Sequence, residues 1–290
     1  MWFIFSVISS LFDSFWQLGN KKLSAGMDHT VINLSLFLFG LPVYLTALAI
    51  GGIPSIGLDY LWSAPFNILV DFIAFNALTT AYAIGEMSLV MPLLTFSSIV
   101  VVLTGPLIVG EFPSLIGLFG ILVIVAGAYL LNLSTMRAGW WRPIQALYTD
   151  RASQLALLVA VLWGINSQVA KVSLDNSSAG FHLTVVGIGG SLAFGLQLWL
   201  KRRRHTVAFI RRKVHLLFLM GAFAGISVIA QFAAYDSPGG LVAYVISIKR
   251  LSLLLGAYFG WLIFRERKIR ERAVGSALML CGVVLMAIYG

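Results

Sequence analysis

The sequence predicts an all-α membrane protein with ten transmembrane helices, arranged as two inverted five-helix repeats. Of the 290 residues, 59% are hydrophobic and only 11% are charged, whereas about 25% are charged in an ordinary soluble domain. The apolar residues gather in ten segments, each close to the roughly 20 residues that a helix needs to cross a bilayer. A set of residues also recurs at a constant spacing between the two halves of the chain. This composition excludes a soluble enzyme and a disordered chain, and the single cysteine, Cys281, excludes a disulfide-stapled secreted domain.

Each apolar segment predicts one helix, because lipid offers backbone polar groups no partner outside the segment itself. The segments cover residues 2–20, 30–50, 60–82, 86–109, 113–132, 152–174, 180–200, 214–235, 239–264 and 268–289. The first has no basic residues before it and contains Asp13, so we expect a retained helix and not a signal peptide. Asn67, Asp71 and Asn76 interrupt the third segment. We expect Pro92 and Pro106 to kink the fourth.

The basic residues are distributed asymmetrically over the connecting loops. Seventeen of the twenty Lys and Arg lie in odd-numbered loops, whereas the even-numbered loops carry only acidic charges, at Asp59, Glu111, Asp175 and Asp236. The positive-inside rule therefore predicts cytoplasmic odd loops and both termini outside, in a membrane such as the bacterial inner membrane. We expect the basic loops to contact anionic lipid headgroups. We expect no nucleic-acid partner, because the longest basic loop, 201–213, has too few aromatic residues to stack bases.

A repeat is visible at an offset of 155 residues. The matching pairs are Gly85 with Gly240, Ser97 with Ser252, Gly105 with Gly260, Glu111 with Glu266, Gly120 with Gly275, and Gly127 with Gly282. The repeat divides the chain into a first five-helix repeat (1–133), a basic cytoplasmic linker (134–151) and a second five-helix repeat (152–290). Because five is odd, the two repeats must insert with opposite orientations, as in secondary transporters that expose a midplane site alternately to each side.

The phrases GEFPSLIGLFGILVIVAG and FRERKIRERAVGSALMLCG occupy matching positions in the two halves. These two phrases resemble the ten-helix, EamA-type branch of the drug/metabolite transporter superfamily, and the resemblance extends over essentially the whole chain. The resemblance implies two five-helix bundles around a central cavity and transport of a small metabolite of unspecified kind. Members of this size usually place both termini in the cytoplasm, whereas the loop charges of this chain predict the opposite orientation.

Lys249 and Arg250 are the clearest functional candidates, because they lie about ten residues inside the ninth segment. A charge near the bilayer midplane costs at least about 2.5 kcal/mol. Their sequence, SIKRLS, resembles the Lys-Arg pair of sugar-phosphate and nucleotide-sugar translocators, where the pair is associated with the phosphate of the substrate. Arg offers a bidentate fork for phosphate or carboxylate, and Lys offers a compact second charge. The alternatives are a structural pairing with Asp13 and Asp71, or a role in coupling or gating.

Three acidic residues are candidates for coupling or for counter-ions. Asp13 and Asp71 lie in the middle of their segments, and each either carries a proton, balances the basic pair or has a plain packing role. Gln17 lies one turn after Asp13 and therefore shares its helix face, which makes it a candidate to contact a substrate. Glu86 lies at a segment edge, where it is either a functional acid or a simple helix N-terminal charge.

Four further polar residues are candidates for the substrate site. Asn166 and Lys171 lie in the sixth segment, where Lys171 either lines the cavity or extends to the outer surface. Gln231 and Tyr244 either orient a ligand or make hydrogen bonds between helices. With no phosphate-binding loop, metal-ligand spacing or nucleophile motif, we expect no cofactor, no metal and no enzymatic activity.

The sequence thus favours a secondary active transporter of a small, anionic metabolite that bears a phosphate or a carboxylate. One alternative is an exporter of neutral or zwitterionic metabolites such as amino acids. Another is a flippase for a lipid-linked phosphate, and a third is an assembly or sensory component without transport. We expect a monomer or a homodimer.

Overall fold

A computed structural model of the chain describes residues 1–24, 26–85, 87–133, 149–201, 207–255, 258 and 273–289. All regular structure within these ranges is helical. Five of the described helical stretches are long and apolar enough to cross a membrane, and three shorter helices are also apolar. The prediction of an all-helical membrane protein is confirmed.

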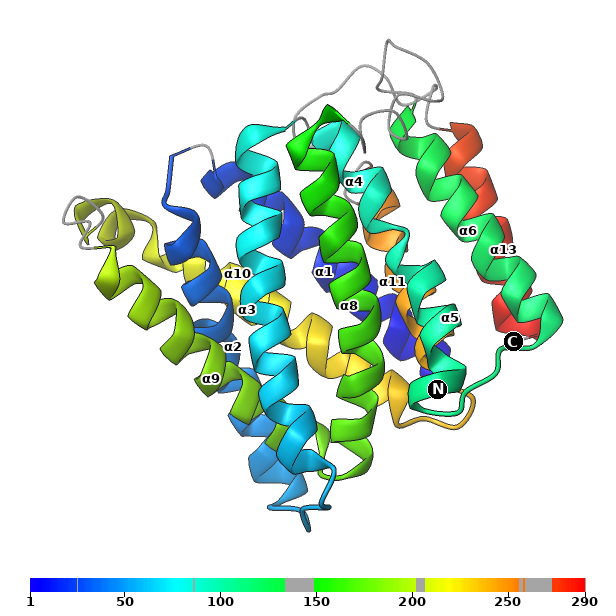
Figure 1. Cartoon of the computed structure of the whole chain (residues 1–290), viewed down its shortest axis with the longest axis horizontal. Helices are drawn as coiled ribbons and strands as arrows, with labels where there is room; N and C mark the ends of the chain where they lie inside the picture. Colours follow the sequence, from blue (N-terminus) through cyan, green and yellow to red (C-terminus); the bar gives the residue numbers. More distant parts are fainter. Residues whose placement is uncertain are drawn as a thin grey trace.

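The helices follow the predicted segments closely (Figure 1). The first half contains α1 (Trp2–Ser24), α2 (His29–Gly51), α3 (Tyr60–Ile84), α4 (Met87–Leu94), α5 (Ser97–Ile108) and α6 (Leu115–Leu133). The second half contains α8 (Arg151–Asp175), α9 (Ala179–Leu200), α10 (Val207–Tyr235), α11 (Val242–Lys249) and α13 (Ala273–Tyr289).

Side-chain caps define several helix starts. The Asp28 carboxylate accepts a hydrogen bond from Thr30 N at 2.8 Å and begins α2. Asp150 accepts from Ser153 N at 2.9 Å at the start of α8, and Ser178 caps α9 in the same way. Such caps satisfy backbone donors that the first turn of a helix leaves without partners.

The fourth predicted segment forms two helices instead of one kinked helix. The break falls at Thr95 and Phe96, between α4 and α5, three residues after the expected kink at Pro92. Helix α11 stops in the same way before a turn at Arg250. Both α4 and α11 are eight residues long, and their bounds differ by the 155 residues of the sequence repeat. The two interrupted helices therefore correspond to each other in the two halves.

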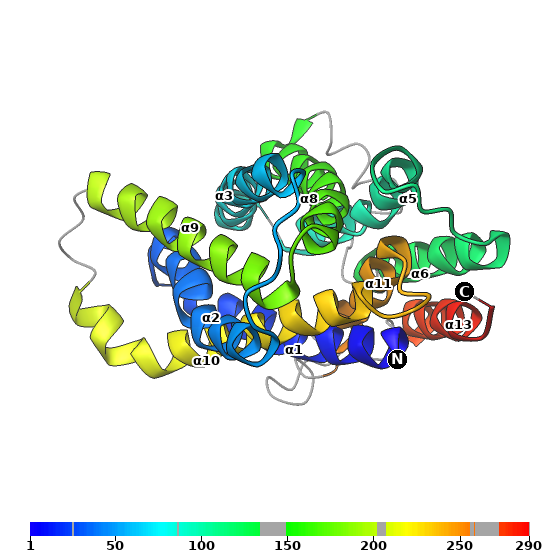
Figure 2. The same cartoon turned by 90° about the horizontal axis from the view of Figure 1, so that it is seen from below.

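The main helix pairs each join the first half of the chain to the second. Helix α3 packs against α8, α2 against α9, α1 against α10, and α6 against α13. Figure 2 shows α6 and α13 together at one end of the molecule and α9 and α10 at the other. Helices α6 and α13 approach each other closely at their glycines. A Cβ added to Gly120 would lie only 3.0 Å from the Gly282 carbonyl oxygen. Small residues allow this approach between membrane helices.

The N-terminus of α1 and the C-terminal end of α13 lie on the same side of the molecule (Figure 1). This side also contains the loops that carry Asp59, Glu111, Asp175 and Asp236, and we call it the acidic face. The placement agrees with an even number of membrane crossings, and the side of the membrane that it faces stays a prediction.

Candidate functional site

A cavity of about 220 Å³ lies between the two halves of the chain. Side chains from α1, α2, α3, α4, α8, α9, α10 and α11 line it. Since one water molecule takes about 30 Å³ of liquid volume, the cavity has room for a small metabolite.

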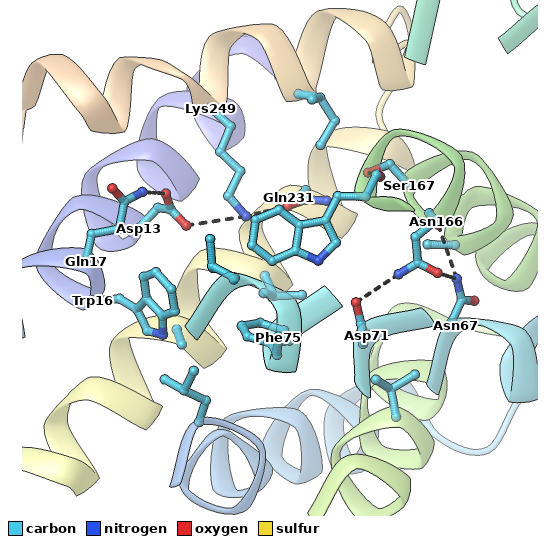
Figure 3. A pocket seen from close by; sticks show the side chains of 18 of the residues that line it. Asp13, Trp16, Gln17, Asn67, Asp71, Phe75, Asn166, Ser167, Gln231 and Lys249 are labelled. Atoms are coloured by element: carbon cyan, nitrogen blue, oxygen red, sulfur yellow. Dashed lines mark hydrogen bonds and ion pairs between the residues drawn. The ribbon is translucent and has the colours of Figure 1, made fainter. Parts of the chain in front are cut away.

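The cavity brings together most of the polar residues that the sequence singled out (Figure 3). Those that line it are Asp13, Gln17, Asp71, Asn166, Gln231, Lys249 and Arg250. They come from five different helices and, for Arg250, from the turn after α11, so residues far apart in the sequence meet at one site.

Lys249 lies between two partners at one side of the cavity. Its ammonium donates a hydrogen bond to Gln231 Oε1 at 2.7 Å and lies 3.6 Å from Asp13 Oδ1. Asp13 in turn accepts a hydrogen bond from Gln17 Nε2 at 2.6 Å. The positive charge of Lys249 is therefore balanced by one carboxylate, at the long end of ion-pair distance.

Arg250 is less completely satisfied than Lys249. Its guanidinium donates a hydrogen bond to Ser97 Oγ, at the break between α4 and α5. Its Nε–H is buried and has no hydrogen-bond partner among the described residues. A buried donor without a partner costs about 1–3 kcal/mol, so Arg250 has unused capacity to bind an acceptor.

Asp71 forms a separate acidic site in the cavity. Figure 3 shows it well away from Lys249. Its Oδ1 accepts a hydrogen bond from Asn166 Nδ2 at 2.9 Å, and Asn166 Oδ1 accepts one from Asn67 Nδ2 at 2.8 Å. Asp71 makes no ion pair with any residue in the described part of the chain. The cavity thus holds two acidic and two basic side chains, of which one pair is in contact.

Aromatic and histidine side chains complete the walls, and the sequence interpretation did not assign them to the site. They are Trp16, Phe37, Tyr44, Phe75, Tyr82, Trp163, His182 and Phe232. A polar residue such as His182 inside an apolar segment was a usable signal. The aromatic residues gave none, because such residues are common on every face of a membrane helix.

Two predicted site residues lie elsewhere. Lys171 pairs with Asp175, one turn on in α8, at the acidic face. The Tyr244 hydroxyl accepts a hydrogen bond from Ser114 N at 2.9 Å and joins α11 to the start of α6. Both residues lie outside the cavity lining. Glu86 lies outside the described residues.

Glu111 makes a second contact between α11 and the first half of the chain. Its Oε2 accepts a hydrogen bond from Val242 N, the first residue of α11, at 2.7 Å. Burial raises the pKa of the Glu111 carboxyl, although the bond from Val242 and the charge of Lys171 oppose this effect. Since Lys249 ends the same helix, α11 connects the acidic face to the cavity.

The described ranges contain no group of three or more His, Cys, Asp or Glu side chains that could hold a metal ion. The polar residues of the cavity fit an organic ligand better, because they combine two cations, two carboxylates and several amides with an apolar wall.

The helical membrane fold encloses a cavity that is lined by charged side chains. Residues 151–288 match the model of the EamA-like transporter family. These residues make up nearly all of the second half of the chain, which is therefore similar to an EamA-like transporter domain. This match agrees with the resemblance found in the sequence, and the apolar helices agree with an integral, multi-pass membrane protein.

A curated relative is the "Probable amino-acid metabolite efflux pump" of Salmonella typhimurium strain LT2. It is 32% identical to this chain over 139 residues, which are 46% of this chain and 41% of the relative. The match thus spans about two fifths of the relative. A solved crystal structure is similar over 99% of this chain and 96% of its own, with a TM-score of 0.76 and 12% identity. At this identity the likeness concerns the fold alone.

Proposed function

We propose that the protein is a secondary active transporter of a small metabolite that bears a carboxylate or a phosphate. The observation that carries this proposal is the buried Arg250 Nε–H, which has no partner among the described residues and lies next to Lys249 in the cavity lining. An anionic group on a substrate accepts from this donor and offsets its burial. Hydrogen bonds between a guanidinium and a carboxylate or phosphate are about twice as strong as neutral ones.

Asp13 acts in this proposal as the counter-ion of the empty site. It lies 3.6 Å from the Lys249 ammonium, so an arriving anion competes with it for the same charge. Asp13 is then free to take up a proton or to pair elsewhere while substrate is bound. Asp71 is the second candidate proton carrier, since it has no ion pair with the described residues.

Alternating access is supported by the way the two halves pack. Every main helix pair crosses between residues 1–133 and the second repeat, 152–290, and the interruptions of α4 and α11 match at the repeat offset. At the acidic face, Gly57 N donates to Asn176 O at 2.9 Å, and Glu111 accepts from Val242 N. These contacts tie the two halves together on one side and must break for that side to open. Most of the linker 134–151 lies outside the described residues.

A zwitterionic metabolite, such as an amino acid, is the second candidate substrate. Asp71 offers a carboxylate away from Lys249 (Figure 3), which suits a ligand with charges at both ends. The name of the Salmonella relative points in the same direction. Under this alternative the basic pair binds the substrate carboxylate and Asp71 binds its ammonium group.

We further propose a bacterial inner-membrane location with the acidic face and both termini outside, as the loop charges predict. The basic loops then contact anionic lipids on the cytoplasmic side. The transporter acts as a monomer or a homodimer.

Counterflow in proteoliposomes tests the function. Vesicles containing the purified protein are loaded with a panel of carboxylate, phosphate, zwitterionic and neutral metabolites, and exchange with labelled compound is measured. We expect exchange of compounds that carry an anionic group, reduced at least about tenfold in Arg250→Gln, because a charge-assisted bond contributes about 1.5–3 kcal/mol. The matched control, Lys171→Gln, removes a cation outside the cavity lining and should keep the exchange. Exchange of neutral compounds alone, unchanged in Arg250→Gln, would contradict the proposal.

A further inference from the structure

A histidine at the cavity wall has no role in the proposed anion site. His182 lies in the first turns of α9 and lines the cavity, yet only 1% of its surface is exposed. Its Nδ1 is buried and has no hydrogen-bond partner among the described residues.

The aromatic neighbours of His182 hold its ring in one orientation. The ring stacks on Phe232 with centroids 5.6 Å apart and planes at 28°. It also meets the Tyr60 ring edge-on at 5.8 Å and 86°. A phenylalanine ring can stack on the same neighbours and would leave no buried polar atom without a partner. The imidazole is therefore an unfavourable choice for packing alone.

We infer that His182 is a specificity-determining residue, which hydrogen-bonds an uncharged polar group of the transported metabolite. The inference rests on the proposed function, because His182 lines the same cavity as the basic pair. Phe232, on which His182 stacks, follows Gln231, whose amide holds Lys249. His182 and Lys249 thus contact neighbouring residues of α10, and both line the same cavity. The substrate class is then a small organic acid or phosphate ester with a hydroxyl, carbonyl or amide group away from the acid.

The inference predicts opposite signs for stability and for binding. His182→Phe removes an unsatisfied polar group, so the melting temperature of the empty protein should rise. The same change removes the partner of the substrate's polar group, so the affinity for a hydroxylated anion should fall on the order of tenfold. A histidine that serves only the packing would lose stability and leave the preference among ligands unchanged.

The experiment is thermal unfolding of the purified full chain with matched ligands. The ligand pairs are butanoate with γ-hydroxybutanoate, and propyl phosphate with glycerol phosphate, which differ in hydroxyl groups away from the acid. The wild type should be stabilised more by the hydroxylated member of a pair, and His182→Phe should be stabilised equally by both members. His182→Gln, which keeps a hydrogen-bonding amide, should retain part of the preference.

Tyr60→Phe is the matched control. The Tyr60 hydroxyl is also buried without a partner among the described residues, but Tyr60 is not part of the cavity lining. Its removal should raise the melting temperature without changing the ligand preference.

The outcomes separate this inference from the proposed function. If no member of either pair stabilises the wild type, anion binding fails, and both proposals are wrong. If both members stabilise the wild type and His182→Phe alike, the role of His182 is wrong and the anion site stands. A lower melting temperature of empty His182→Phe, together with an unchanged hydroxyl preference, would show a packing role instead.

Discussion

The Asp13–Lys249 pair gives the most quantitative prediction. The two side chains come from α1 and α11, and their exposed fractions are 19% and 17%. We predict that Asp13→Asn and Lys249→Gln each lower the free energy of unfolding, because each leaves the other charge buried without its counter-ion. The double variant Asp13→Asn/Lys249→Gln should be more stable than the sum of the two single effects implies.

The magnitude follows from the distance between the charges. At 3.6 Å and an effective dielectric constant of about 20, the Coulomb attraction is about 4–5 kcal/mol. Desolvation of the two charges opposes most of this attraction. Removing one partner should cost about 3 kcal/mol, because the other charge is then buried without its counter-ion. The coupling energy from the double-mutant cycle should be about 1–3 kcal/mol.

The assay is reversible unfolding of the wild type and the three variants in mixed micelles, followed by circular dichroism. The amide oxygen that Asp13→Asn introduces still accepts a hydrogen bond from Gln17, so helix α1 keeps its local contact and the cycle reports mainly on the ion pair. A coupling energy below about 0.5 kcal/mol, the usual error of additivity, would refute the account of Asp13 as the counter-ion of Lys249.

Three further predictions concern the framework around the cavity. Glu111→Gln keeps the hydrogen bond from Val242 but cannot ionise. Because burial raises the Glu111 pKa, the wild type should gain stability relative to the variant as the pH falls through this raised pKa. Gly180→Ala should lower the free energy of unfolding by about 1–3 kcal/mol, because the new Cβ would lie 2.5 Å from Leu48 N. Asp150→Ala should lower it by about 1 kcal/mol through loss of the helix cap.

Unfolding at several pH values checks these predictions, and each has its own contrary result. The sign for Glu111 follows from linkage: a raised pKa gives stability that is present below the usual value of 4.5 and is lost as the pH rises through the raised pKa. A stability difference between wild type and Glu111→Gln that does not change with pH would contradict this sign.

Gly195→Ala is the control for Gly180→Ala, since no atom lies within 4 Å of its Cβ. Equal effects of the two changes would show that the contact with α2 is unimportant.

The stability that Asp150 contributes changes with pH in the opposite direction. Burial acts to raise its pKa, but the hydrogen bonds that it accepts from Ser153 and Ala152 outweigh this and hold the pKa below the usual 3.8. The contribution of the cap should therefore be complete above that value and disappear as the pH falls through the lowered pKa. A difference between wild type and Asp150→Ala that persists in strong acid would argue against the cap.

Helix positions were predictable from the sequence, whereas helix breaks and helix pairing were only partly so. Apolar length alone places α2, α3 and α9 within a few residues. The turn at Thr95 and Phe96 carries no Gly or Pro of its own, so no local signal marks it. The packing of α3 against α8 depends on contacts between distant segments, which a local hydropathy pattern does not contain.

Some site residues could be predicted from the sequence, because the free-energy cost of placing a charge in lipid is enough to identify them. Charges such as Lys249 and Asp71 are too expensive in lipid, so they must face the interior. The misplaced candidates depend on helix phase. Tyr244 lies five residues before Lys249, which is about 140° around the helix at about 100° per residue, and it therefore faces α6 and not the cavity. Lys171 lies one turn from Asp175 and pairs with it locally.

In the proposed transporter, Lys249 and Arg250 hold an anionic group of the substrate. The most direct test of this role is the thermal stabilisation of the purified protein across a panel of phosphorylated, carboxylate and neutral metabolites, compared with Lys249→Gln/Arg250→Gln and with Lys171→Gln. A ligand that binds only the folded state raises the melting temperature according to its concentration and affinity. The account predicts stabilisation by anionic compounds that Lys171→Gln keeps and the double variant loses. Stabilisation by neutral compounds alone, unchanged in a folded double variant, would contradict it and leave the basic pair as a structural lock.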